Sequence, residues 1–119
     1  MRFRILLALI AVAACGGGGS DTTAPPLTPT TPANPIATSS VSLQSNLFNP
    51  ADIVVSPSAV VTFTNNDGIS HNVVFANQGI ASIADWSSGN RTATMPVTPG
   101  TYTYTCTIHA GMNGTVKVQ

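Results

Sequence analysis

Most of this chain consists of short segments in which apolar and polar residues alternate. The clearest segment is 101–106, where Tyr102, Tyr104 and Cys106 share one face and threonines occupy the other. Residues 60–64 alternate in the same way. A period of two is typical of β-strands with one buried face. If that face of 101–106 is the core, the thiol points inward at the end of its strand.

Turn signals separate the apolar segments at regular intervals. The clearest are residues 65–68 (Asn-Asn-Asp-Gly) and 99–100 (Pro-Gly). No segment has the 3.6-residue period of a long helix, although residues 80–91 are irregular. The pattern therefore predicts an all-β fold, an antiparallel sandwich or barrel. Strands are expected over residues 41–43, 53–55, 60–64, 72–75, 92–95, 101–106 and 114–118.

The start of the chain has the layout of a secretory signal. Arg2 and Arg4 precede an apolar run over residues 5–12, and small residues follow. The run is too short to span a membrane, which takes about 20 apolar residues. Residues 12–15 (Val-Ala-Ala-Cys) resemble the lipobox of bacterial lipoproteins, in which the cysteine, here Cys15, becomes the lipidated first residue. The alternative is an ordinary signal peptide that happens to contain a cysteine.

The composition divides the chain into three parts. Residues 1–14 are predicted to be the lipoprotein signal peptide, and 15–38 the lipidated cysteine with a linker rich in Gly, Thr and Pro. Residues 39–119 form one small domain. The protein is expected to be exported and lipid-anchored to a bacterial membrane, on its periplasmic or cell-surface face. A disordered leader or a glycosylated stalk are alternatives for the linker.

The domain is nearly uncharged. It carries Asp52, Asp67 and Asp85 against Arg91 and Lys117. No basic stripe is present, which argues against a nucleic-acid partner. Few charges also mean weak electrostatic steering, so a partner would dock mainly by apolar contact. The aspartates are interpreted as turn and surface residues, and nothing indicates a general base or a small-molecule substrate pocket. The sequence therefore does not predict an enzyme.

One short loop gathers soft metal ligands. Cys106, His109 and Met112 lie within it, and His71 is the other of the two histidines in the chain. Cys15 is explained by lipidation, so Cys106 is a lone thiol in an exported domain. A buried inert thiol is the alternative reading. A trigonal His₂Cys set with a weak axial Met suits copper, and copper is the predicted cofactor.

Three motifs together resemble the cupredoxin family, and specifically its plastocyanin/amicyanin-like members. They are residues 46–50 (Asn-Leu-Phe-Asn-Pro), 70–75 (Ser-His-Asn-Val-Val-Phe) and 99–109 (Pro-Gly-Thr-Tyr-Thr-Tyr-Thr-Cys-Thr-Ile-His). The Cys-x₂-His-x₂-Met spacing is like that of amicyanin. The resemblance covers about residues 41–119. It implies a small antiparallel Greek-key β-sandwich holding one type 1 copper ion.

The resemblance also implies roles for individual residues. Asn72 and Thr107 would support the ligands. The backbone N–H of Asn72 would point at the Cys106 sulfur, and the side chain of Asn72 would tie the two ligand segments together near Thr107. The implied copper ligands are His71, Cys106 and His109 in the equatorial plane, the histidines binding through Nδ1, and Met112 as the long axial ligand.

The implied function is transfer of one electron through Cu(I)/Cu(II), by a monomer whose partner is another redox protein, a cytochrome or an oxidase. His109 would expose one ring edge, and Ile69 and Phe48 could complete an apolar collar. The acidic patch of plant plastocyanins is absent, so a photosynthetic partner does not follow. The expected docking surface comprises Ile69, Ala110, Gly111 and Asn113.

Two other functions compete with electron transfer. A copper carrier or store would pass on the metal itself, but carriers usually have open sites rich in Met or Cys. A metal-free adhesion or structural sandwich would leave the four ligand positions free to vary. The presence of all four together argues against that alternative.

Overall fold

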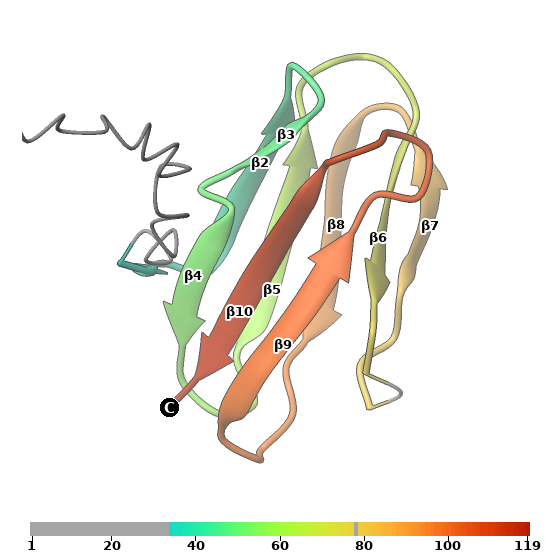
Figure 1. Cartoon of the computed structure of the whole chain (residues 1–119). Coiled ribbons are helices and arrows are strands. Elements are labelled where there is room, and N and C mark those ends of the chain that lie inside the picture. The colour runs from blue at the N-terminus through green and yellow to red at the C-terminus, as the bar shows by residue number, and fades with distance from the viewer. Residues whose placement is uncertain (1–33, 78) are drawn as a thin grey trace, which may run out of the picture.

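The computed structural model describes residues 34–77 and 79–119, which form two β-sheets packed face to face (Figure 1). The predicted signal peptide, Cys15 and the linker up to residue 33 lie outside the described residues. Within the described part of the chain, no helix is long and apolar enough to cross a membrane. The strands are β1 (Ile36–Ala37), β2 (Ser40–Gln44), β3 (Leu47–Asn49), β4 (Asp52–Val55), β5 (Val60–Asn65), β6 (His71–Phe75), β7 (Ile83–Trp86), β8 (Gly89–Thr94), β9 (Gly100–Thr105) and β10 (Asn113–Val118).

The β-sandwich predicted from the sequence is confirmed, but its sheets are mixed and not purely antiparallel. One sheet has the order β1-β4-β10-β9-β6-β7 and the other the order β3-β2-β5-β8. The pairs β1/β4, β4/β10 and β2/β5 are parallel. The chain changes sheets after β3 and again after β4. Strands that lie side by side in a sheet are therefore often distant in sequence, and such strands can run in the same direction.

The folded part begins before residue 39, the domain start expected from composition. Strand β1 pairs in parallel with β4, with Ile36 opposite Ile53 and Ala37 opposite Val54. Without β1, the outer edge of β4 would present unpaired backbone N–H and C=O groups. Covering this edge explains why two residues of the predicted linker range adopt a strand.

The inward faces of both sheets follow the alternation seen in the sequence. In β5, Val61 and Phe63 are completely buried, and in β9 Tyr104 is 2% exposed. Met95 and Trp86 are also buried. Burying each large apolar side chain contributes roughly 1.5–3 kcal/mol, so these positions hold the two sheets together.

An aromatic cluster lies in the core directly below the end of β9. The Tyr104 ring makes edge contacts with Phe48 and Phe63, at centroid distances of 4.8 and 5.5 Å, and a tilted contact with Phe75 at 5.6 Å. Such pairs add about 0.5–1.5 kcal/mol each beyond area burial. Cys106 follows Tyr104 by two positions, so the cluster fixes the strand that presents the thiol.

The hydroxyl of Tyr104 is held at the other edge of this cluster. It donates a hydrogen bond of 2.8 Å to the Ala51 carbonyl. Burial raises the pKa of Tyr104 well above its usual value, and the nearby Asp52 charge raises it further. Gly114 lies against the same ring: a Cβ there would overlap both the Tyr104 ring and the Ala51 carbonyl oxygen.

We therefore expect Gly114→Ala to destabilise the domain by about 1–3 kcal/mol, as overpacking of a core does. Gly79→Ala is the matched control, because a Cβ at Gly79 meets no atom within 4 Å. Urea unfolding of both variants measures the difference. Equal unfolding midpoints would contradict the close packing of Tyr104 against Gly114.

Candidate metal centre

Strand β9 ends directly before Cys106, and its alternation decides where the thiol points. Tyr102 and Tyr104 face the core, and Cys106 continues that face and is 2% exposed. The predicted inward direction of the thiol is therefore confirmed. The thiol forms no disulfide within the described residues, so its sulfur remains available as a ligand.

The loop between β9 and β10 is closed by hydrogen bonds onto the end of β9. The amide of Cys106 donates to the Met112 carbonyl at 2.9 Å, and the Met112 amide to the His109 carbonyl at 3.4 Å. The Thr105 hydroxyl also donates to the Met112 carbonyl, at 3.1 Å. Gly111 turns the loop with a φ of +79°, which glycine adopts without steric cost. The loop thus folds back beside Cys106, and the Met112 side chain is completely buried.

The pairing of β6 with β9 delivers the remaining histidine. In this antiparallel pair, Val74 lies opposite Thr105 and Phe75 opposite Tyr104. The start of β6 therefore lies beside the end of β9. His71 is the first residue of β6 and is completely buried. A residue 35 positions away in sequence thereby reaches the thiol.

Three donor atoms converge on one point. The Sγ atom of Cys106 lies 3.8 Å from Nδ1 of His71 and 3.5 Å from Nδ1 of His109. All three ligand atoms lie within 4.8 Å of one another. If one ion binds S at about 2.3 Å and N at about 2.0 Å, with an S–metal–N angle of about 110–120°, the S and N atoms lie about 3.5–3.7 Å apart. The spacing therefore fits a single transition-metal ion.

The chemistry of these donors selects the metal. A thiolate is soft and imidazole is intermediate, a combination that suits copper and zinc. Met112 adds a buried thioether from the same loop. A trigonal His₂Cys set with a weak thioether is the arrangement of blue-copper electron-transfer sites. The residues present therefore fit copper, while the long axial contact of Met112 stays a prediction.

Asn72 ties the two ligand segments together, as expected. Its side-chain oxygen accepts a hydrogen bond of 2.8 Å from the Thr107 amide, and its Nδ2 donates to the Thr107 hydroxyl at 2.8 Å. Nδ2 also donates to Asp85 at 2.9 Å, a contact that sequence reasoning missed. The expected direction of the Asn72 backbone N–H toward the Cys106 sulfur stays a prediction.

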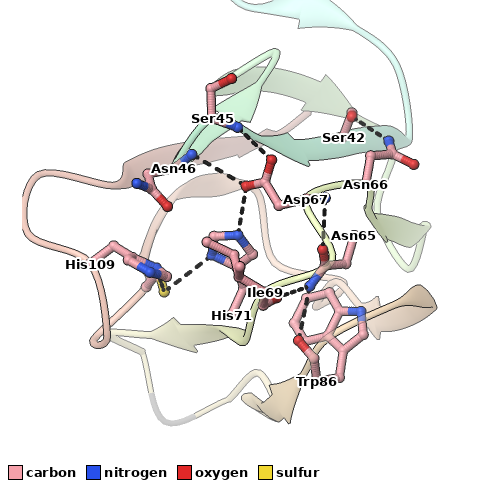
Figure 2. Close-up of polar contacts among 11 residues, drawn as sticks. Ser42, Ser45, Asn46, Asn65, Asn66, Asp67, Ile69, His71, Trp86 and His109 are labelled. Carbon is pink, nitrogen blue, oxygen red and sulfur yellow. Dashed lines mark hydrogen bonds and ion pairs between the residues drawn. The ribbon is translucent and has the colours of Figure 1, made fainter.

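Asp67 is the site residue that sequence reasoning misplaced. It was interpreted as a turn and surface residue, yet its carboxylate lies 2.8 Å from Nε2 of His71 (Figure 2). It also accepts hydrogen bonds from the amides of Ser45, at 2.6 Å, and Asn46, at 3.3 Å. Burial raises the pKa of Asp67, but these hydrogen bonds outweigh it and hold the pKa below the usual value. Ligating histidines commonly donate their second N–H to a carboxylate, which is the signal that could have identified Asp67.

The two histidines differ in exposure. His71 is completely buried, whereas His109 is partly exposed. Figure 2 shows the two rings near the sulfur, with His71 directed toward Asp67 and His109 away from it. Their ring centroids are 4.6 Å apart. His109 therefore provides the route from the ligand cluster to the surface.

The residues predicted for docking are all exposed. Ile69 is 45% exposed, and Ala110, Gly111 and Asn113 are exposed in and next to the ligand loop. Sequence reasoning missed Ile108, which is 44% exposed in the same loop.

The expected collar also included Phe48, and that part is wrong. Phe48 is 4% exposed because its ring packs against Tyr104 in the core.

Residues 37–119 match the family of copper binding proteins described as the plastocyanin/azurin family. A plastocyanin of Scenedesmus fuscus is 35% identical over 85 residues, which cover 61% of this chain and 87% of that protein. A chloroplastic plastocyanin of Oryza sativa subsp. indica is 34% identical over 82 residues, covering 60% of this chain and 53% of that one. The chain thus spans about half the length of the chloroplastic relative.

Solved structures agree with this match. A reduced Cu(I) form of an amicyanin mutant superimposes with a TM-score of 0.61 and 25% sequence identity, over 67% of this chain and 80% of that one. An oxidised amicyanin mutant gives a TM-score of 0.60 at 25% identity, with the same coverage. The type 1 copper site of this protein is formed by His71, Cys106, His109 and Met112. The chain belongs to the plastocyanin/azurin family of copper-binding proteins.

Proposed function

We propose that this protein carries single electrons between redox proteins while anchored to a bacterial membrane through a lipid on Cys15. The electron-transfer part of this proposal is supported by the burial of the ligand cluster away from solvent. His71 and Cys106 are buried, and His109 alone of the three clustered donors reaches the surface. Such a site favours passage of an electron over passage of the metal or access of a substrate.

Copper, when bound, supplies a one-electron Cu(I)/Cu(II) couple. The chain contributes a rigid cradle for it. His71 is fixed in β6, Cys106 follows β9, and Asn72 joins the two segments through its two side-chain hydrogen bonds to Thr107. A cradle held in this way changes little when the charge on the metal changes, which favours fast electron exchange.

The placement of pockets supports a carrier of electrons and not an enzyme. A surface pocket lies over the outer side of β9 and β10, lined by residues that include Val74, Thr103 and Thr115. A second pocket lies near Val55 and Ser56. Neither of these two pockets is lined by a copper ligand.

The partner is proposed to be a redox protein, a cytochrome or an oxidase, that docks over His109. The loop around this ring offers Ala110 and Gly111, whose small size lets a partner approach, and the exposed apolar side chain of Ile108. Ile69 adds a second exposed apolar side chain from the loop before β6. With few charges on the domain, the contact would be mainly apolar.

The purified protein should turn intensely blue on addition of Cu(II), because of charge transfer from the Cys106 thiolate. Cys106→Ser should abolish the visible band, whereas Cys15→Ser, the matched control, should keep it. Absorption spectra of the three proteins check this. A folded wild-type protein that stays colourless with Cu(II) would reject the proposal, and rapid release of copper to a chelator would favour a carrier of the metal.

The same pair of variants tests the anchor in bacterial cells. Cys15→Ser should move the protein from the membrane fraction to the soluble exported fraction, because the acceptor of the lipid is gone. Cys106→Ser should stay with the membranes. Fractionation followed by immunoblotting measures both. Membrane association that survives Cys15→Ser would contradict lipidation at this residue.

Ala110→Glu should slow electron self-exchange by about tenfold, because two like charges would meet as the docking surfaces approach; tenfold corresponds to about 1.4 kcal/mol. Val97→Glu is the matched control, since Val97 is 70% exposed in the loop between β8 and β9, at the far end of β9 (Figure 1). NMR line broadening in mixtures of reduced and oxidised protein gives the rates. An unchanged rate for Ala110→Glu with an intact blue band would contradict docking at His109.

A further inference from the structure

The Asp67 carboxylate connects the copper ligand His71 with a turn of the opposite sheet. One oxygen, Oδ1, accepts from the Ser45 amide, and the other, Oδ2, accepts from the Asn46 amide and lies 2.8 Å from Nε2 of His71. Figure 2 shows the carboxylate between the turn and the imidazole. We propose that Asp67 is a positioning residue of the copper centre, which fixes the tautomer of His71 and stabilises Cu(II) relative to Cu(I).

The tautomer follows from the chemistry of the pair. An ionised carboxylate can only accept hydrogen bonds. The contact with Asp67 therefore requires the proton of His71 on Nε2. Nδ1 then carries the free lone pair, and it is Nδ1 that lies 3.8 Å from the Cys106 sulfur. The carboxylate thus directs the lone pair of His71 at the metal position.

The carboxylate itself is held in place from several directions. The backbone amide of Asp67 donates to Oδ1 of Asn65 at 3.1 Å, and Asn65 is buried. Nδ2 of Asn65 in turn donates to the carbonyls of Ile69 and Trp86, both at 2.9 Å. These bonds fix the segment that runs from β5 to β6. Asp67 therefore cannot swing away from His71 without breaking contacts on both sides.

The turn that receives the carboxylate needs this support. Ser45 and Asn46 have φ values of 55° and 56°, in the left-handed region that side chains other than glycine adopt at a cost. A purely structural role for Asp67 would require only its bonds to these two amides. The third contact, to a buried imidazole, is the one that assigns Asp67 to the copper centre.

The charge of Asp67 acts on the redox balance. Cu(II) with the Cys106 thiolate and the Asp67 carboxylate is neutral in sum, whereas the reduced centre carries one net negative charge. His71 is completely buried and the Asp67 side chain is 14% exposed, so water screens the interaction only in part. No Lys or Arg in the described residues forms a salt bridge with Asp67. The carboxylate therefore favours the oxidised state.

The test uses the copper-loaded protein and the variant Asp67→Asn. An amide has one acceptor oxygen, so it cannot serve both Ser45 and His71, and it carries no charge. The ratio of Cu(II) to Cu(I) binding constants should fall by roughly tenfold, the lower end of the effect of removing such partners. For a one-electron couple this raises the reduction potential by about 59 mV. Protein-film voltammetry measures the shift.

Two controls separate this role from a structural one. Asp52→Asn removes the same charge from a residue that is bonded to Thr115 and to no ligand. Asn66→Ala breaks an exposed hydrogen bond of 2.7 Å to Ser42, between the same two segments, and spares the carboxylate. Both should leave the potential unchanged. An Asp67→Asn potential equal to that of wild type would overturn the proposal.

A measurement on the wild-type protein keeps the proposal testable even if Asp67→Asn fails to fold. In the Cu(I) protein, the Nε2 proton of His71 should appear in the NMR spectrum and exchange with water at least tenfold more slowly than that of His109. Equal exchange rates would overturn the proposal. The proposal rests on copper binding, so a wild-type protein that takes up no copper would overturn both it and the proposed function, whereas a blue protein with an unshifted Asp67→Asn potential would overturn only the role of Asp67.

Discussion

The antiparallel pairing of β6 with β9 is the interaction on which the copper site depends. Cys106, His109 and Met112 share one loop, but His71 reaches them only because β6 lies beside β9. A slip of one residue in this register would turn His71 to the other face of the sheet. The hydrogen bonds between Asn72 and Thr107 span the same two segments and oppose such a slip.

Much of the site could be predicted because its information is local. The alternation of 101–106 carries the inward direction of Cys106, and the spacing of the following ligands requires only that the loop turn back on itself. The exposure of Ala110 and Gly111 follows from the same loop. The partnership of Asn72 with Thr107 links distant segments, and it was accessible only through resemblance to a known family.

The remainder depends on contacts that no local pattern contains. The turn signal around Asp67 was interpreted correctly as a turn, but nothing in it specifies that the carboxylate reaches Ser45, beyond the end of the neighbouring strand β2, and His71 of the opposite sheet. The parallel directions of β2 and β5, and the addition of β1 to the edge of β4, are likewise set by how the chain crosses between the sheets. Phe48 was misplaced because an apolar residue near a turn has the same local pattern whether it packs inward or outward.

For the proposed electron transfer, the unequal exposure of the two histidine ligands constrains the order of events. Because His71 is buried in the core and His109 is the histidine ligand that reaches the surface, the proposed electron donor and electron acceptor would use the same small face. The two partners would then not bind at the same time, so the protein would not conduct electrons between them within one complex. Each cycle then requires one partner to leave before the other arrives, and weak, short-lived contacts serve this carrier better than tight ones.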